Sequence, residues 1–266
     1  MTKLTPLNTA LKKRIHLFGV EIDPLTMGET VDLIAEWLSQ PDKTCKFVVT
    51  PNVDHIVKVQ TDIGLQAAYK QAALIVTDGK PIVLAANLLG INIPGTVPGS
   101  DLVPAIFDHA QRTKTTVKVF LLGAMPGVAD RAKANIHDKW PLVDVVGTLS
   151  PDFGFDKSRV DSKAICEIIN KSGAELLVLG LGAPKQELWI TQYAPDISVK
   201  VALCVGATID FLAGEKARAP MWMRKVGLEW LHRMLSEPKR LAKRYLIDAI
   251  VFPKLIVNEW LTRRNT

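Results

Sequence analysis

Six short β-rich runs alternate with longer helical patterns along the first 210 residues of this chain. Several of these runs are apolar without interruption, as at residues 176–179, which read Leu-Leu-Val-Leu. Uninterrupted apolar runs are typical of strands buried on both faces of a parallel sheet. Their alternation with helices predicts an open, mostly parallel α/β sandwich. The predicted strands cover residues 46–50, 74–77, 117–123, 143–147, 175–182 and 200–206.

The intervening segments show the spacing of apolar residues that is typical of helices. These predicted helices cover residues 27–39, 53–71, 81–89, 101–111, 128–140, 160–172 and 184–193. In open α/β sheets, ligands bind beyond the carboxyl ends of the strands. We therefore expect the functional residues at the strand-to-helix junctions.

The charge of the chain is concentrated in its last fifty-odd residues. Residues 1–213 carry 21 Lys and Arg against 22 Asp and Glu, whereas residues 214–266 carry 12 against 5. We divide the chain there, into an α/β catalytic core (1–213) and a basic amphipathic C-terminal helical appendage (214–266). Two helices are predicted in the appendage, over residues 222–235 and 238–260, with Trp230 in the core. The second is either a membrane-surface helix or an ordinary helix packed on the core.

Several classes of protein do not fit the composition. No run of about 18 uncharged apolar residues is present, so no membrane span is expected. No apolar stretch suitable for a signal peptide follows the basic residues near the N-terminus, so we expect a cytoplasmic protein. Neither the three cysteines nor the five histidines show the spacing of metal ligands, so we expect no metal site and no cofactor.

Polar residues follow the first two predicted strands. Thr50 and Asn52 offer neutral donors and acceptors of the kind that sugar hydroxyls need, although Asn52 also suits the N-cap of the next helix. Asp78 follows the second strand, where burial raises the pKa of a carboxyl group toward the range of a general base. The alternative for Asp78 is also helix capping, ahead of Pro81.

Three later junctions carry weaker signals. A turn from Gly123 to Gly127 leads into a helix, whose free N–H groups favour phosphate, or it is a tight turn without a ligand. Gln186 and Glu187 fall in the first turn of another helix and are candidates for binding the donor and its sugar, although acidic residues are favourable there through the helix dipole alone. Asp210 follows the last strand and suits a ribose or base edge, or an ordinary cap.

Four stretches, in order, carry a family resemblance. They are Thr77-Asp78-Gly79, Gly99-Ser100-Asp101-Leu102, Gly182-Ala183-Pro184-Lys185-Gln186-Glu187 and the run over residues 218–245. Together they resemble the WecG/TagA/CpsF glycosyltransferase family, also called glycosyltransferase family 26, over about residues 18–245. The resemblance implies a Rossmann-like core with a C-terminal appendage that reaches the membrane.

The resemblance also implies an activity. It is the inverting, metal-independent transfer of a hexose or N-acetylhexosamine-type sugar from a UDP-sugar to a polyprenyl-diphosphate-linked saccharide, at the inner face of the cytoplasmic membrane. Such products belong to exopolysaccharide or teichoic acid-type polymers. Asp78 matches the proposed general base of the family, Thr50 and Asn52 match sugar-pocket positions, Gln186 lies near the active site, and Asp210 lies near the uridine.

The family pattern is broken at one position. Members commonly carry Arg three residues before the glycine of the Gly-Ser-Asp motif, whereas this chain has Thr96. This departure indicates another cation or a different donor sugar. The leaving diphosphate needs cations or N–H groups, and Arg suits bidentate phosphate contacts. The candidates for contacts with the lipid diphosphate or the membrane are Arg218, Arg224, Arg233, Arg240 and Arg244.

Two hypotheses without catalysis remain as alternatives to the enzyme hypothesis. A basic tail with interleaved aromatic residues also fits a nucleic-acid-binding module, for which the polar strand ends have no use. The tail helix also fits an interaction protein that docks at a membrane. Our main hypothesis expects no nucleic acid as partner, and the broad apolar faces permit a homo-oligomer.

Overall fold

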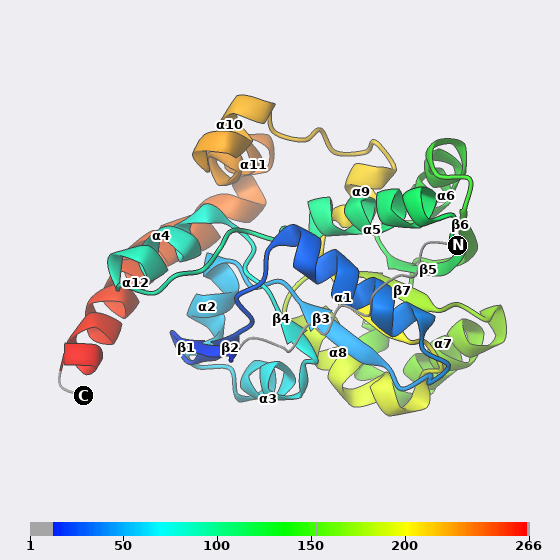
Figure 1. Cartoon of the computed structure of the whole chain (residues 1–266), viewed down its shortest axis with the longest axis horizontal. Coiled ribbons are helices and arrows are strands. Elements are labelled where there is room, and N and C mark those ends of the chain that lie inside the picture. The colour runs from blue at the N-terminus through cyan, green and yellow to red at the C-terminus, as the bar shows by residue number, and fades with distance from the viewer. Residues whose placement is uncertain (1–12, 153, 265–266) are drawn as a thin grey trace, which may run out of the picture.

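The computed structural model describes residues 13–152 and 154–264. Its core is a six-stranded, all-parallel sheet in the order β4-β3-β8-β7-β5-β6 (Figure 1). All six predicted strands are present, although most are shorter than expected. They are β3 (Lys46–Val49), β4 (Leu74–Ile75), β5 (Val117–Gly123), β6 (Val143–Leu149), β7 (Leu176–Gly180) and β8 (Val201–Cys204).

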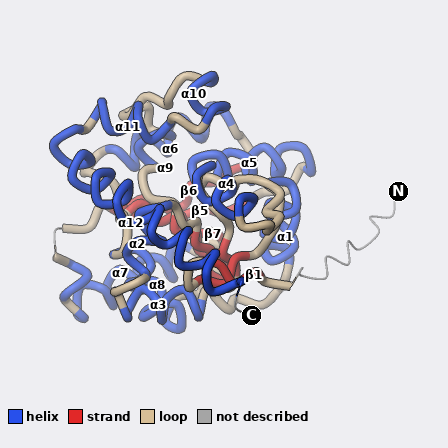
Figure 2. Tube along the Cα trace, turned by 90° about the vertical axis from the view of Figure 1, so that its left-hand side faces the viewer, coloured by secondary structure: helices blue, strands red, loops and turns tan. Residues whose placement is uncertain are grey.

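Helices cover both faces of the sheet. Figure 2 shows the strands in the interior of the molecule, with helices around them. Side chains alternate between two apolar clusters along each strand, because successive residues of a strand point to opposite faces. The core helices are α1 (Met27–Ser39), α2 (Val53–Val59), α3 (Ile63–Gln71), α4 (Lys80–Leu88), α5 (Gly99–Thr113), α6 (Val128–Lys139), α7 (Arg159–Ser172), α8 (Lys185–Tyr193) and α9 (Thr208–Leu212).

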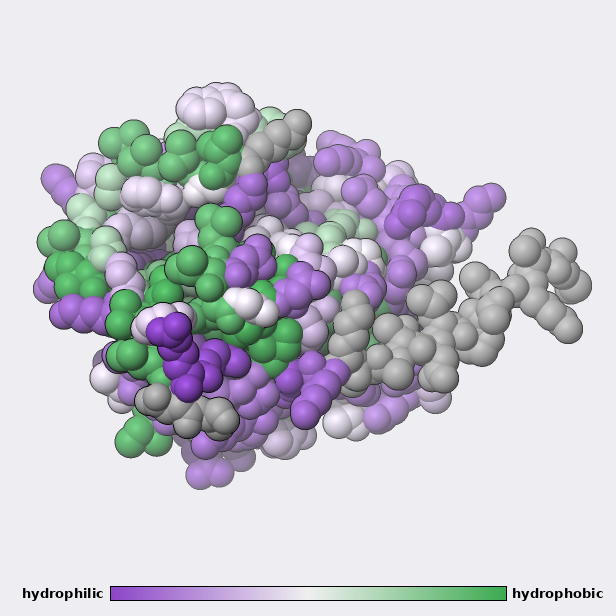
Figure 3. All heavy atoms as spheres, turned by 60° about the vertical axis from the view of Figure 1, so that its left-hand side comes forward, coloured by the Kyte–Doolittle hydropathy of each residue, from purple (hydrophilic) through white to green (hydrophobic). Residues whose placement is uncertain are grey.

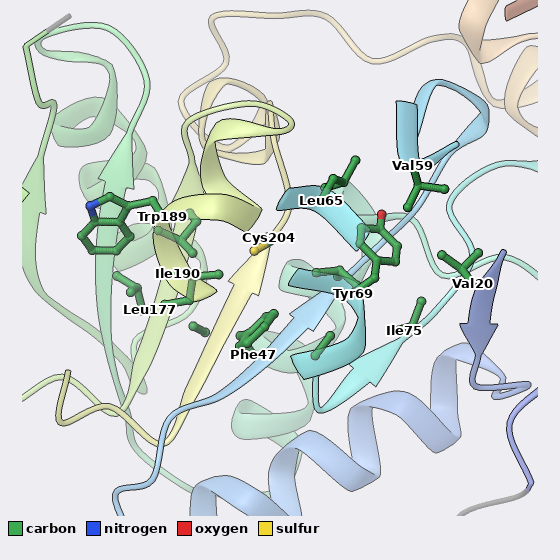
Figure 4. Close-up of a cluster of buried hydrophobic side chains, with 14 of the residues drawn as sticks. Val20, Phe47, Val59, Leu65, Tyr69, Ile75, Leu177, Trp189, Ile190 and Cys204 are labelled. Atoms are coloured by element: carbon green, nitrogen blue, oxygen red, sulfur yellow. The ribbon is translucent and has the colours of Figure 1, made fainter. Parts of the chain in front are cut away.

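One of the two apolar clusters lies between the sheet and helices α2, α3 and α8. Phe47, Leu177 and Cys204 point into it from three neighbouring strands, and Tyr69 and Trp189 point into it from the helices (Figure 4). These side chains are at most 4% exposed. The uninterrupted apolar strands are thus buried on both faces, as the sequence predicted.

Two predicted helices are interrupted in the structure. The segment 53–71 divides into α2 and α3, because the Asp62 side chain caps a new helix by accepting a hydrogen bond from the Leu65 N–H group. The segment 222–235 divides into α10 (Met221–Val226) and α11 (Glu229–Ser236). Gly227 separates these two in the left-handed conformation, with φ of 84°, which favours glycine.

The N-terminal hairpin was not predicted. It pairs β1 (Ile15–Leu17) with β2 (Val20–Ile22), and each strand has only three residues. The hairpin holds the far end of the last helix, α12 (Pro238–Arg264). Phe18 N–H donates to Glu259 over 3.3 Å, and its ring packs edge-on against Phe252. The Arg263 side chain donates to the His16 carbonyl oxygen over 2.6 Å.

Helices α10, α11 and α12 form the C-terminal appendage, at one end of the molecule in Figure 1. Helix α12 packs along α2 and presents Leu241, Tyr245, Phe252 and Ile256 inward. Trp260, near the end of the same helix, is 42% exposed. Trp230 was predicted in the core, but it is 40% exposed, because it packs against Tyr245 rather than under the sheet.

Candidate active site

The predicted junction residues meet at one edge of the sheet, because all six strands run in the same direction. Val49 and Leu179 both align with Cys204, and Gly123 aligns with Gly180. The strand ends therefore lie side by side. A Cβ atom at Gly123 would lie 2.5 Å from the Gly180 backbone, so this close approach requires glycine.

A cavity of about 680 Å³ lies over these strand ends, and we call it the strand-end cavity. Backbone of the glycine-bearing turns after β5 and β7 forms much of its wall. The site residues predicted from the sequence that line it are Thr50, Asn52, Asp78, Gly123, Gln186, Asp210, Arg233, Arg240 and Arg244. Gly127 does not line it, because this residue begins α6 on the far side of the turn.

A second cavity, of about 560 Å³, lies between the core and the appendage, and we call it the appendage cavity. Its wall is rich in apolar and aromatic side chains, including Phe211, Trp230, Tyr245 and Phe252. Thr96, the residue at the family arginine position, also lines it. The two cavities meet at a shared wall formed by Asn52, Asp78, Val205, Ala207, Arg233 and Arg244.

Asp78 lies at this junction and is not a helix cap. Its N–H group donates to the Pro51 carbonyl oxygen over 2.7 Å, which holds the residue at the end of β4. The N-cap of α4 is Gly79, and no side chain caps that helix. Burial raises the pKa of Asp78 from its ordinary value of 3.8 to about 7, while Arg233 opposes the rise. Such a carboxyl group is suited to accept a proton near neutral pH.

Asn52 caps α2, which is one of the two roles predicted for it from the sequence. Its Oδ1 atom accepts the His55 N–H group at 3.3 Å and so caps α2. The same oxygen accepts a hydrogen bond from the Arg244 side chain at 3.4 Å. Asn52 also lines both cavities. Thr50 is buried beside it, and its hydroxyl donates to the Cys204 carbonyl oxygen.

Glu187 lies beneath the strand-end cavity rather than in its wall. It is fully buried, and it accepts a hydrogen bond from Gln186 Nε2 at 2.8 Å. Gln186 Oε1 in turn accepts the Gly206 N–H group at 3.2 Å, so the pair holds the loop after β8. Burial raises the pKa of Glu187 to about 7. His55, 4.0 Å away, has its pKa lowered to about 4 by burial and contacts the Tyr69 hydroxyl.

Most appendage arginines have carboxylate partners. Arg218 and Arg224 both pair with Asp101 of the Gly-Ser-Asp motif, at 3.1 and 2.6 Å. Arg240 pairs with Glu237 at 2.6 Å, and Arg244 pairs with Asp54 at 3.2 Å. Among the described residues, Arg233 alone of these five forms no ion pair or side-chain hydrogen bond. The pairs with Asp101 and Asp54 hold the appendage against the core, whereas the pair of Arg240 and Glu237 lies within the appendage. Arg233 is left free at the cavity junction.

Sequence reasoning overlooked two residues at the wall of the appendage cavity, Asp54 and Asp248. Asp248 is one of two acidic residues in α12, and it falls on the inward face between Leu241 and Phe252. An acidic residue among the apolar positions of a basic helix is a sequence signal from which Asp248 could have been predicted as a site residue. Within the described segments, no three His, Cys, Asp or Glu side chains are grouped as metal ligands.

Comparisons with known proteins show the family to which the chain belongs. The model of the "Glycosyl transferase WecG/TagA/CpsF family" matches residues 15–266. The chain belongs to this family. Its relatives include proteins of Staphylococcus aureus strains MRSA252 and MW2, both named N-acetylglucosaminyldiphosphoundecaprenol N-acetyl-beta-D-mannosaminyltransferase. Each is 28% identical over 247 residues, which are 92% of this chain and 92% of the relative.

Proposed function

We propose that this protein is an inverting glycosyltransferase that moves a sugar from a UDP-sugar to a polyprenyl-diphosphate-linked saccharide. The observation that carries the proposal is the position of Asp78 at the junction of two cavities of different character. The strand-end cavity occupies the place where open α/β sheets bind nucleotides. The appendage cavity, with its aromatic wall, suits the sugar and first isoprene units of a lipid-linked acceptor.

In the proposed reaction, the acceptor hydroxyl enters from the appendage cavity. Its oxygen bonds to the anomeric carbon of the donor while the Asp78 carboxylate takes its proton. The bond from the anomeric carbon to the UDP oxygen breaks, and UDP leaves with the electron pair. Arg233 supplies positive charge for the diphosphate, and the Met125 N–H group, in the turn after Gly123, supplies a further donor.

We further propose that the appendage docks on the inner face of the cytoplasmic membrane. No helix in the described part of the chain is long and apolar enough to span a bilayer. The outer side of α12 carries an exposed apolar stripe, with Leu246, Ile250, Val257 and Leu261 each 48–63% exposed. Lys239, Lys243 and Lys254 are exposed on the same side, by their helical spacing. Figure 3 shows apolar side chains gathered on this side of the molecule.

A stripe of this composition suits an anionic lipid surface. Each basic residue near such a surface contributes about 1 kcal/mol of attraction, and the apolar side chains enter the headgroup region. Docking there would bring the appendage cavity to the lipid that carries the acceptor. Family membership favours this catalytic hypothesis over a nucleic-acid-binding or purely docking role for the basic tail.

The names of the relatives describe transfer of N-acetylmannosamine to an N-acetylglucosaminyl-diphosphoundecaprenol acceptor. We propose an acceptor of that chemical class here, and a donor that is a hexose or an N-acetylhexosamine. The test is a panel of UDP-sugars with a polyprenyl-diphosphate-linked N-acetylglucosamine acceptor, read by mass spectrometry. One donor should give a product heavier by one sugar residue. The absence of product with every donor and acceptor tried, despite UDP binding, would contradict the proposal.

A further inference from the structure

The inward face of α12 brings a carboxylate into the wall of the appendage cavity. Asp248 lines that cavity together with Arg244, Tyr245 and Phe252, which lie one helical turn or less to either side. The residue is only 5% exposed. A buried carboxylate in an aromatic wall is costly unless its oxygens are hydrogen-bonded.

The hydrogen bonds of the surrounding groups leave one oxygen of Asp248 without a partner. Asp54 accepts Lys58 Nζ at 2.8 Å and lies 3.2 Å from Arg244 Nε. Arg244 Nη2 donates to Asn52. Among the described residues, Asp248 Oδ2 has no hydrogen-bond partner, and neither has Arg244 Nε, which lies 4.0 Å from it. Asp248 Oδ2 is thus a buried acceptor without a hydrogen bond, and it lies beside the Arg244 guanidinium, whose Nε atom is already paired with Asp54.

The chemistry of this pair selects the class of ligand that fits it. A carboxylate repels a phosphate group, so the site does not suit the diphosphate. A hydroxyl group donates one hydrogen bond and accepts another, and so can bind a carboxylate and a guanidinium at once. Sugar hydroxyls are groups of this kind. Arg244 and Asn52 also line the strand-end cavity, so the pair lies close to the wall where Asp78 is found.

We propose that Asp248 and Arg244 form a subsite for the acceptor sugar, in which one hydroxyl donates to the Asp248 carboxylate and accepts from the Arg244 guanidinium. This inference rests on the proposed function and deepens it. The appendage thereby selects the acceptor sugar as well as carrying the protein to its lipid. Asp248 is a specificity-determining residue in this arrangement, because it binds the acceptor without taking part in proton transfer.

The experiment uses the full chain, detergent-solubilised polyprenyl-diphosphate-linked N-acetylglucosamine, and analogues in which single hydroxyls of that sugar are replaced by hydrogen. For the wild type, loss of the bonded hydroxyl should raise the acceptor KM about 10-fold or more, as for a hydrogen bond to a charged group. Asp248→Ala should raise the KM for the intact acceptor similarly and be insensitive to loss of that same hydroxyl. The KM for the donor should not change.

Asn258→Ala, a change at an exposed position on the same helix, is the control. Asp248→Asn keeps the size of the side chain and serves if the alanine variant does not fold, with UDP binding as the check of an intact core. If every analogue affects the wild type and the Asp248 variants equally, the subsite is refuted while the transferase proposal stands. If the wild type transfers no sugar at all, the proposed function itself fails.

Discussion

Asp78 and Arg233 lie together at the wall that separates the two cavities, and neither side chain has an ion-pair or hydrogen-bond partner among the described residues. Arg233 is the cation with the largest effect on the Asp78 carboxyl group. One residue comes from the end of a core strand and the other from α11 of the appendage. The proposed base and the proposed diphosphate contact thus meet only when the appendage is docked.

Replacing Asp78 by Asn should lower kcat by about 10²-fold or more, since a positioned general base contributes about that factor. UDP binding, measured by calorimetry, should change little, because we propose that the nucleotide binds over the other strand ends. Asp138→Asn, on the exposed side of α6, is the matched control. Near-normal turnover by the Asp78 variant would remove this residue from the chemistry.

The pH dependence of turnover should report the Asp78 carboxyl group. A base must be ionised to accept a proton, so kcat should rise as the pH passes through about 7, the raised pKa of Asp78. Because Arg233 lowers that pKa, Arg233→Gln should move the rise to higher pH as well as reducing turnover. If kcat of the Arg233→Gln variant rose at the same pH as kcat of the wild type, Arg233 would have no effect on the pKa of the catalytic base.

The buried Asp78 carboxyl group should lower the free energy of unfolding of the protein at neutral pH. The folded pKa of Asp78 lies above its unfolded value, so the native state binds more protons than the unfolded state between about pH 4 and 7. Stability associated with this group is therefore present at low pH and lost as the pH rises through about 7. Asp78→Asn should raise Tm by a few degrees at pH 8 and by less at pH 5, measured by calorimetry. An equal Tm difference at both pH values would argue against this account.

Asp101 should act as the main docking point of the appendage, since it pairs with both Arg218 and Arg224. Asp101→Asn should make the segment around residues 213–220 more sensitive to limited proteolysis and lower transfer to a lipid-linked acceptor. Each of these partly exposed pairs contributes about 1 kcal/mol or less, so the whole fold should survive. Asp108→Asn, on the same helix α5 but away from the appendage arginines, provides the comparison. Unchanged proteolysis would show that other contacts hold the appendage.

The outer stripe of α12 should govern attachment to lipid. Changing Leu246, Ile250 and Val257 together to Gln removes apolar side chains that are already exposed, so folding should be retained. Sedimentation with vesicles containing phosphatidylglycerol should fall about 10-fold or more for this variant. The wild type should also detach at high salt, because its Lys residues are screened there. Equal sedimentation of variant and wild type would place the membrane contact elsewhere.

Local sequence patterns predicted most of the sheet and its helices. Runs such as residues 176–179 are apolar at every position, and only a strand covered on both faces buries all of them. The rule that parallel strands end at one edge then brought Thr50, Asp78 and Gln186 to one place. The three-residue strands of the hairpin were not predicted, because segments so short carry too little pattern. Their contacts with α12 join residues more than two hundred positions apart in the chain.

The sequence by itself determined the α/β core, the junction residues and the basic character of the tail, because each follows from residues near one another in the chain. Only the tertiary structure decided which charges are free. Arg218 and Arg233 look alike in sequence, yet Asp101, more than a hundred residues away, pairs with the first and leaves the second at the cavity junction. The same holds for Asp248, whose unpartnered oxygen depends on how α12 packs against α2. Charge pairing acts over a few ångströms of space and not along the chain, so it appears only once the fold has brought distant residues together.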